Sequence, residues 1–139
     1  MELFVKNWYF AFLKLVMQQL STLNIFLAIV YVLLYLKSGT FNSTSGIFMI
    51  IVFNWLALRG FQLNTYRWRV WHYLIAAWVL YFIGRLVYGG ISILDSSITY
   101  GFMSSDTLTY LLVNFLFCML VLVQLIKYAY ENYKELKLN

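Results

Sequence analysis

"TLTYLLVNFLFCMLVLVQLI", residues 107–126, is a run of twenty residues without a single Asp, Glu, Lys or Arg. A helix rises about 1.5 Å per residue, so twenty residues extend over roughly 30 Å, the thickness of the hydrocarbon core of a bilayer. An uncharged apolar run of this length is typical of a membrane-spanning helix. The sequence therefore predicts that this segment crosses a membrane.

The composition of the whole chain agrees with this prediction. Of the 139 residues, 63% are hydrophobic and only 11% are charged, whereas a soluble domain carries about 25% charged residues. At about 20 residues per span the chain has room for four spans. Besides 107–126, we expect spans at about 21–37, 45–61 and 70–93.

The first twenty residues have a different pattern. Asn7, Lys14 and Gln18 recur at helical spacing among aromatic and aliphatic side chains, which predicts an amphipathic helix over 1–20 that lies in the membrane interface. A direct continuation of this helix into the first span is the alternative. Residues 127–139 are predicted to form a short charged tail. The predicted fold is thus all-α: an N-terminal interfacial helix, a bundle of four transmembrane helices over 21–126, and the tail.

The distribution of basic residues predicts the orientation. The first loop carries only Lys37 and the third loop carries no Lys or Arg, while the other connections and both termini are basic. The side that holds both termini collects Lys6, Lys14, Arg59, Arg67, Arg69, Lys127, Lys134 and Lys137. Because Lys and Arg concentrate on the cytoplasmic side, we expect both termini in the cytoplasm or an organelle matrix. The membrane is expected to be a bacterial plasma membrane or the mitochondrial inner membrane.

Aromatic and basic side chains alternate in "TYRWRVWHYL", residues 65–74. Trp and Tyr anchor helices at the membrane surface, and Arg meets lipid phosphate there. Together with the start of the chain, this segment supplies the expected interface anchors: Lys6, Trp8, Lys14, Arg67, Trp68, Arg69, Trp71 and His72.

Arg85 lies inside "VLYFIGRLVYGG", residues 79–90, which is otherwise uncharged. Counting from the predicted span ends places Arg85, Asn54 and Asn114 at one level, roughly 10 Å below the outer interface. A charge at such depth costs about 2.5–3.5 kcal/mol on insertion scales. In one interpretation, Arg85 reaches outward to headgroups or pairs with Asp95 or Asp106 at the outer rim. In the other, Arg85 and the two amides line a polar cleft for an anionic lipid head, a partner's carboxylate or an ion.

Several function classes are disfavoured. Cys118 and His72 are the only residues of their types, the predicted spans contain no acidic residue, and no P-loop is present. We therefore expect no catalytic residue, no metal ligand and no bound cofactor. The net charge of +5 does not indicate nucleic-acid binding, because the basic residues flank apolar segments and form no separate patch.

These observations predict a small non-catalytic subunit that packs through its helices into a larger membrane complex. The expected partners are membrane lipids and other membrane protein subunits, and a homo-oligomer is also considered. The alternative function is that of a small homo-oligomeric channel, transporter or lipid flippase with a polar level around Arg85.

Overall fold

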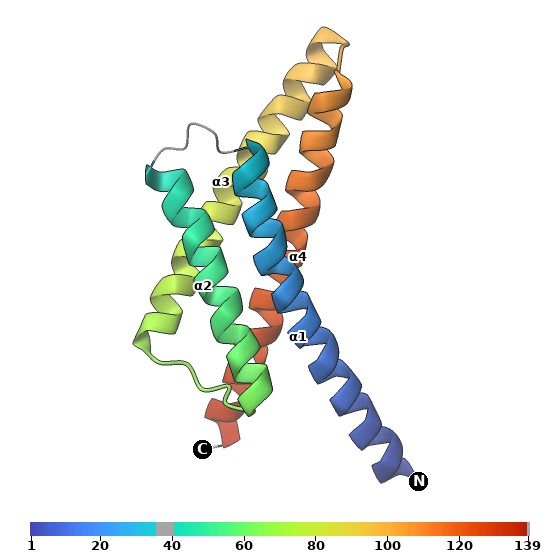
Figure 1. The fold of residues 1–139 in the computed structure, drawn as a ribbon, viewed down its shortest axis with the longest axis vertical. Coiled ribbons are helices and arrows are strands. Elements are labelled where there is room, and N and C mark those ends of the chain that lie inside the picture. The colour runs from blue at the N-terminus through green and yellow to red at the C-terminus, as the bar shows by residue number, and fades with distance from the viewer. Residues whose placement is uncertain (36–40, 139) are drawn as a thin grey trace.

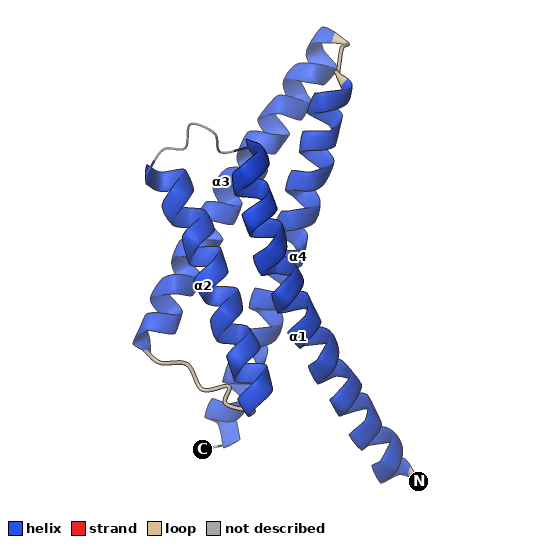
Figure 2. Ribbon diagram, viewed as in Figure 1, coloured by secondary structure: helices blue, strands red, loops and turns tan. Residues whose placement is uncertain are grey.

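A computed structural model describes residues 1–35 and 41–138, and shows four helices joined by short loops (Figure 1). The helices are α1 (Glu2–Tyr35), α2 (Phe41–Leu63), α3 (Val70–Tyr100) and α4 (Ser105–Leu138). Each is long and apolar enough to cross a membrane. The described part of the chain contains no strand (Figure 2). The predicted all-helical fold with four span-length helices is therefore confirmed.

Three helices are longer than a span requires. Helices α1, α3 and α4 have 34, 31 and 34 residues, which at about 1.5 Å per residue corresponds to roughly 45–50 Å. Helix α1 continues without a break through the boundary predicted at residue 20, and α4 includes most of the predicted tail. The continuous α1 is the alternative that the sequence allowed for residues 1–37. Lys37 and the rest of the first predicted loop before residue 41 lie outside the described residues.

The helices pack along one continuous seam. Buried side chains recur at alternating steps of three and four residues, the spacing that brings one helix face against neighbours in a left-handed bundle. The seam positions are Met17, Ser21, Asn24, Ala28 and Tyr31 on α1; Ile47, Ile50, Asn54, Ala57 and Phe61 on α2; His72, Ala76, Val79 and Ile83 on α3; and Leu111, Asn114, Cys118, Val121, Leu125, Tyr128 and Asn132 on α4. Helices α1 and α3 each contact α2 and α4, and α2 also contacts α4.

The two ends of the bundle differ in shape (Figure 1). At one end, α3 and α4 extend beyond α1 and α2 as a hairpin, here called the outer hairpin (residues 91–110). Its turn is closed by Gly101, whose positive φ of 66° turns the chain so that the Phe102 N–H donates to the Ser97 carbonyl at 3.2 Å. At the opposite end lie both termini, and the start of α1 diverges from the other helices. Residues 1–12 are all exposed and are called the N-terminal arm.

A glycine allows α2 and α3 to approach closely. A Cβ added to Gly46 would lie 2.2 Å from Cδ2 of the Phe82 ring, while one added to Gly84 on α3 would meet no atom within 4 Å. Because the Phe82 ring is itself buried, it has little room to move. Gly46 therefore sets the spacing of these two helices.

We expect Gly46→Ala to lower the free energy of unfolding by about 1–3 kcal/mol, the usual cost of overpacking a filled core. Gly84→Ala is the matched control, and it should leave stability unchanged or raise it by up to about 1 kcal/mol, since Ala favours helix. Unfolding of both variants in detergent micelles measures the difference. Equal stability of the two variants would contradict the close packing of α2 on α3.

Candidate functional site

Six polar side chains lie inside the bundle and pair with one another or with backbone carbonyls. We call this set the amide ladder: Ser21, Asn24, Tyr31, Asn54, Asn114 and Gln124. Each of them is at most 3% exposed. They come from α1, α2 and α4, and a hydrogen bond from Asn114 to a backbone carbonyl also reaches α3.

The lower half of the ladder connects α1 to both of its neighbours. Asn24 Nδ2 donates to Asn54 Oδ1 at 3.0 Å on α2 and to the Leu120 carbonyl at 3.2 Å on α4. One turn lower on α1, Ser21 accepts a hydrogen bond from Gln124 Nε2. Asn54 in turn donates to the Ile50 carbonyl of its own helix at 2.9 Å. Within the described residues, Asn24 Oδ1 and Gln124 Oε1 are the ladder's acceptors without a partner.

The upper step of the ladder connects α1, α4 and α3. The Tyr31 hydroxyl donates to Asn114 Oδ1 at 3.3 Å, and Asn114 Nδ2 donates to the Leu86 carbonyl at 3.1 Å. Asn24 and Tyr31 are seven residues apart on α1, which separates the two steps by about 10 Å along the helix. Asn54 and Asn114 therefore lie at two different depths in the bundle, whereas counting from the predicted span ends placed them at the same depth.

Arg85 lies at the level of Asn114 but on the opposite side of α3. The neighbouring Leu86 carbonyl faces Asn114, while the Arg85 side chain is exposed on the outer surface of the bundle. Its guanidinium carbon lies 6.0 Å from the centre of the Tyr81 ring, one turn earlier on the helix. The structure thus brings Asn54 and Asn114 into the interior and leaves Arg85 outside.

The two rim aspartates lie far from Arg85. Asp95 and Asp106 are both exposed on the outer hairpin. Asp95 is ten residues beyond Arg85 on the same helix, a rise of about 15 Å. In the described ranges 1–35 and 41–138, the ion pairs are those of Glu131 with Lys127 and with Lys134. Arg85 therefore has no carboxylate within ion-pair distance in this part of the chain.

The predicted interface anchors divide into two groups. Lys6, Trp8, Arg67, Arg69 and Trp71 are exposed, and Lys14 is half-buried. Trp68 and His72 are each only 8% exposed and lie instead inside the end of the bundle.

One long-range and one local hydrogen bond accompany the inward position of these two rings. The Trp68 backbone N–H donates to Asn132 Oδ1 at 2.8 Å, and the Trp68 ring packs 5.2 Å from Tyr128. His72 Nδ1 accepts from the Arg69 backbone N–H at 3.1 Å at the start of α3. The alternation of basic and aromatic residues in the sequence does not show which aromatic rings pack into the core.

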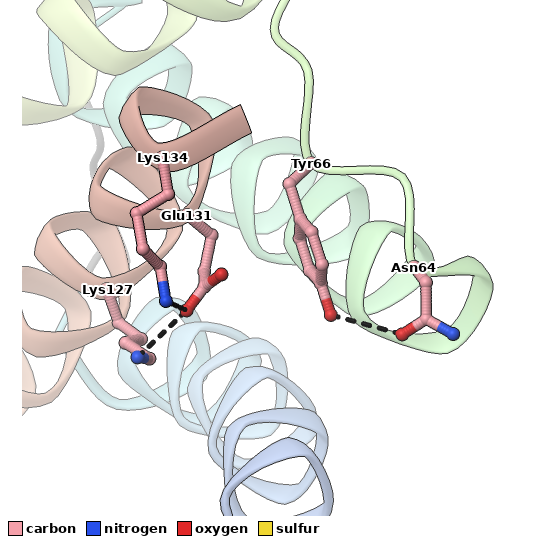
Figure 3. Close-up of polar contacts among 5 residues, drawn as sticks. All are labelled: Asn64, Tyr66, Lys127, Glu131 and Lys134. Atoms are coloured by element: carbon pink, nitrogen blue, oxygen red, sulfur yellow. Dashed lines mark hydrogen bonds and ion pairs between the residues drawn. The ribbon is translucent and has the colours of Figure 1, made fainter. Parts of the chain in front are cut away.

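Beside this aromatic end lies a charged cluster of side chains on α4 (Figure 3). Glu131 Oε1 on α4 accepts from Lys127 Nζ at 2.9 Å and from Lys134 Nζ at 3.3 Å. The two ammonium groups also lie 5.4 and 4.9 Å from the centre of the Tyr130 ring. One carboxylate and one ring thus hold both lysine heads close together.

A cavity of about 360 Å³, which we call the inner pocket, adjoins these lysines. Its lining consists of Phe10, Ala11, Leu13, Lys14, Phe61, Asn64, Tyr66, Lys127, Glu131 and Lys134. The Tyr66 hydroxyl donates to Asn64 Oδ1 at 3.2 Å. Burial raises the pKa of Tyr66 above its ordinary value, and the charges of Glu131 and Glu135 raise it further. Tyr66 is therefore a neutral hydrogen-bond donor at physiological pH.

Sequence reasoning did not identify this pocket or most of the ladder. Asn24 and Gln124 are visible in the sequence as polar residues at seam spacing, and Lys127, Glu131 and Lys134 as a charged set at positions i, i+4 and i+7. Reading the spacing of polar residues within each span would have found the first group. The described residues contain no group of three His, Cys, Asp or Glu side chains placed to hold a metal ion.

Comparison of the chain with protein-family models, with curated proteins and with solved structures finds no match.

The bond between Asn24 and Asn54 should be measurable as a coupling energy. Asn24→Leu leaves Asn54 Oδ1 buried without its donor, and Asn54→Leu removes the acceptor of Asn24 Nδ2, so each single variant should be less stable than the wild type. The double variant should lose less stability than the sum of the two single losses. Hydrogen bonds between helices in membranes give about 0.6 kcal/mol on average and up to about 1.7. Unfolding of the wild type, the two single variants and the double variant in detergent measures the coupling energy. Thr22→Leu, at an exposed site one turn from Gln18, is the control. Fully additive losses would contradict the pairing.

Proposed function

We propose that this chain is a non-catalytic, multi-pass integral membrane protein that serves as an accessory subunit of a larger membrane protein complex. Both termini lie on the cytoplasmic or matrix side in this proposal. A respiratory or energy-converting, secretion or transporter assembly in a bacterial plasma or mitochondrial inner membrane is the setting that we expect.

Arg85 is the observation that carries the proposal. It is the only Asp, Glu, Lys or Arg between Val70 and Leu94, and its exposed side chain lies on the outer surface of α3. Fifteen residues separate it from the start of α3, a rise of about 22 Å. A guanidinium facing lipid at that depth costs about 2.5–3.5 kcal/mol on insertion scales. A carboxylate on a neighbouring subunit would offset this cost by pairing with Arg85.

The surplus length of the helices supports the same proposal. A span tilted by about 20° needs little more than twenty residues, so ten or more residues of α1, α3 and α4 extend beyond the hydrocarbon. Of these segments, the N-terminal arm is strongly apolar, whereas the outer hairpin carries apolar side chains among Ser, Thr and Asp residues. Exposed apolar side chains include Phe4, Trp8 and Phe12 in the N-terminal arm and Ile98, Tyr100 and Phe102 in the outer hairpin. Apolar surface outside the bilayer core favours contact with another protein.

The alternative, a homo-oligomeric channel, transporter or lipid flippase, has less support. Its polar level requires Arg85 to act together with Asn54 and Asn114. These two amides are fully buried and hydrogen-bonded inside the bundle, while Arg85 is outside. A polar path in an oligomer would therefore be lined by Arg85 without them.

The proposal is tested by purification from native membranes in mild detergent. The chain should migrate with other membrane proteins, and Arg85→Leu should reduce their recovery several-fold because the partner's carboxylate loses its counter-charge. Arg59→Leu is the matched control, since Arg59 is also exposed but lies near the inner end of α2, and it should leave recovery unchanged.

Two results would contradict the subunit proposal. One is a wild-type chain that purifies as an isolated monomer, and the other is full recovery of partners with Arg85→Leu. In liposomes, ion or lipid movement that is lost in Arg85→Ala would instead support the transport alternative.

A further inference from the structure

We propose that the inner pocket binds the phosphate head of an anionic phospholipid from the leaflet that faces the two termini. The inference concerns a different part of the molecule from Arg85 and does not depend on the accessory-subunit proposal.

The charge of the pocket favours an anion. Its lining contains three lysines, Lys14, Lys127 and Lys134, and one carboxylate, that of Glu131. Each ammonium has three N–H donors, and Glu131 accepts one from Lys127 and one from Lys134. The lining therefore keeps a surplus of two positive charges and several unused donors. A phosphate diester can accept from more than one ammonium at once.

The arrangement of the donors is fixed by the fold. Glu131 and the Tyr130 ring hold the ammonium groups of Lys127 and Lys134 on the same side of α4. Lys14 reaches the pocket from α1, and Tyr66, whose hydroxyl proton is donated to Asn64, lines it from the loop after α2. Figure 3 shows the two α4 lysines converging on the carboxylate, with Tyr66 and Asn64 beside them. The site is thus assembled from segments far apart in the sequence.

The position of the pocket matches the depth of lipid headgroups. Asn64 and Tyr66 directly follow the last residue of α2, Leu63. Lys14 lies seventeen residues before Tyr31 on α1, about 25 Å below the upper step of the ladder. The pocket is therefore at the end of the spans, on the side where the basic residues concentrate. Anionic lipid phosphates lie at this depth in the cytoplasmic leaflet.

The lining has an apolar part as well as a charged part. Phe10, Ala11 and Leu13 on α1 and Phe61 on α2 form its apolar wall. The start of α1 diverges from α2 and α4 (Figure 1), and the pocket is lined by residues of these helices and of the loop after α2. A lipid carries its phosphate next to its hydrocarbon, so it matches both parts of the lining. An acidic peptide would match only the lysines.

The test uses the full chain in detergent micelles, with native mass spectrometry to count bound lipid. The probes are phosphatidylglycerol, which is anionic, and phosphatidylcholine, which carries no net charge. The pocket variant is Lys14→Gln with Lys134→Gln, which leaves the Lys127–Glu131 pair in place. The control is Lys6→Gln with Lys137→Gln, which removes the same charge at the same end of the molecule but outside the lining.

We expect the wild type and the control to retain phosphatidylglycerol in preference to phosphatidylcholine. The pocket variant should bind phosphatidylglycerol about 25-fold more weakly, because each of the two lysines near an anionic surface contributes about fivefold to binding. Lys14→Arg with Lys134→Arg should restore binding, which separates loss of charge from loss of folding.

Three results would overturn the proposal. Equal loss in the pocket variant and the control would assign the effect to net charge alone. Equal binding of the two lipids by the wild type would remove the preference for an anion. Unchanged phosphatidylglycerol binding by the pocket variant, together with loss of co-purifying proteins, would assign the pocket to an acidic protein partner.

Discussion

Hydrogen bonds between buried amides are the interaction on which the arrangement of this bundle depends. In a bilayer, lipid would be as apolar as the helix surfaces, so no hydrophobic force would select which faces of the helices meet. Asn24 provides that selection, because it donates to Asn54 on α2 and to the Leu120 carbonyl on α4. A rotation of α1 would leave these amides among apolar groups without hydrogen-bond partners, which is costly. The apolar side chains of the seam then fill the remaining space between the helices, whose register is set by the polar contacts.

The inward direction of the amides determines what the outer surface presents. Helix α3 buries Phe82, Ile83 and Gly90 at the level of Asn114 and leaves Arg85 exposed on its outer surface. At the other end of the bundle, the seam on α1 begins only at Met17. The residues before it diverge from α2 and α4, and this divergence opens the inner pocket beside Lys127 and Lys134. The two surfaces with proposed roles are therefore consequences of the same interior packing.

The sequence predicted the helical class and the four span-length helices because apolar length and scarce charge carry that information directly. It did not predict the helix ends, since the chain has no Pro and few Gly to stop a helix where a span ends. The single level of Arg85, Asn54 and Asn114 followed from those assumed ends. The inward turn of Trp68 depends on Asn132, 64 residues away along the chain. Such long-range partners are not visible in local spacing.

The central claim is a four-pass bundle whose termini share one side of the membrane, opposite the outer hairpin. Labelling of single cysteines with a membrane-impermeant thiol reagent tests it most directly, and the native Cys118 is buried and should stay unlabelled. In intact cells or sealed organelles, a cysteine at Ser97 should react, whereas cysteines at Glu2 and Lys137 should react only after the membrane is opened. Reaction of the Glu2 and Lys137 positions from opposite faces would contradict the four-pass arrangement.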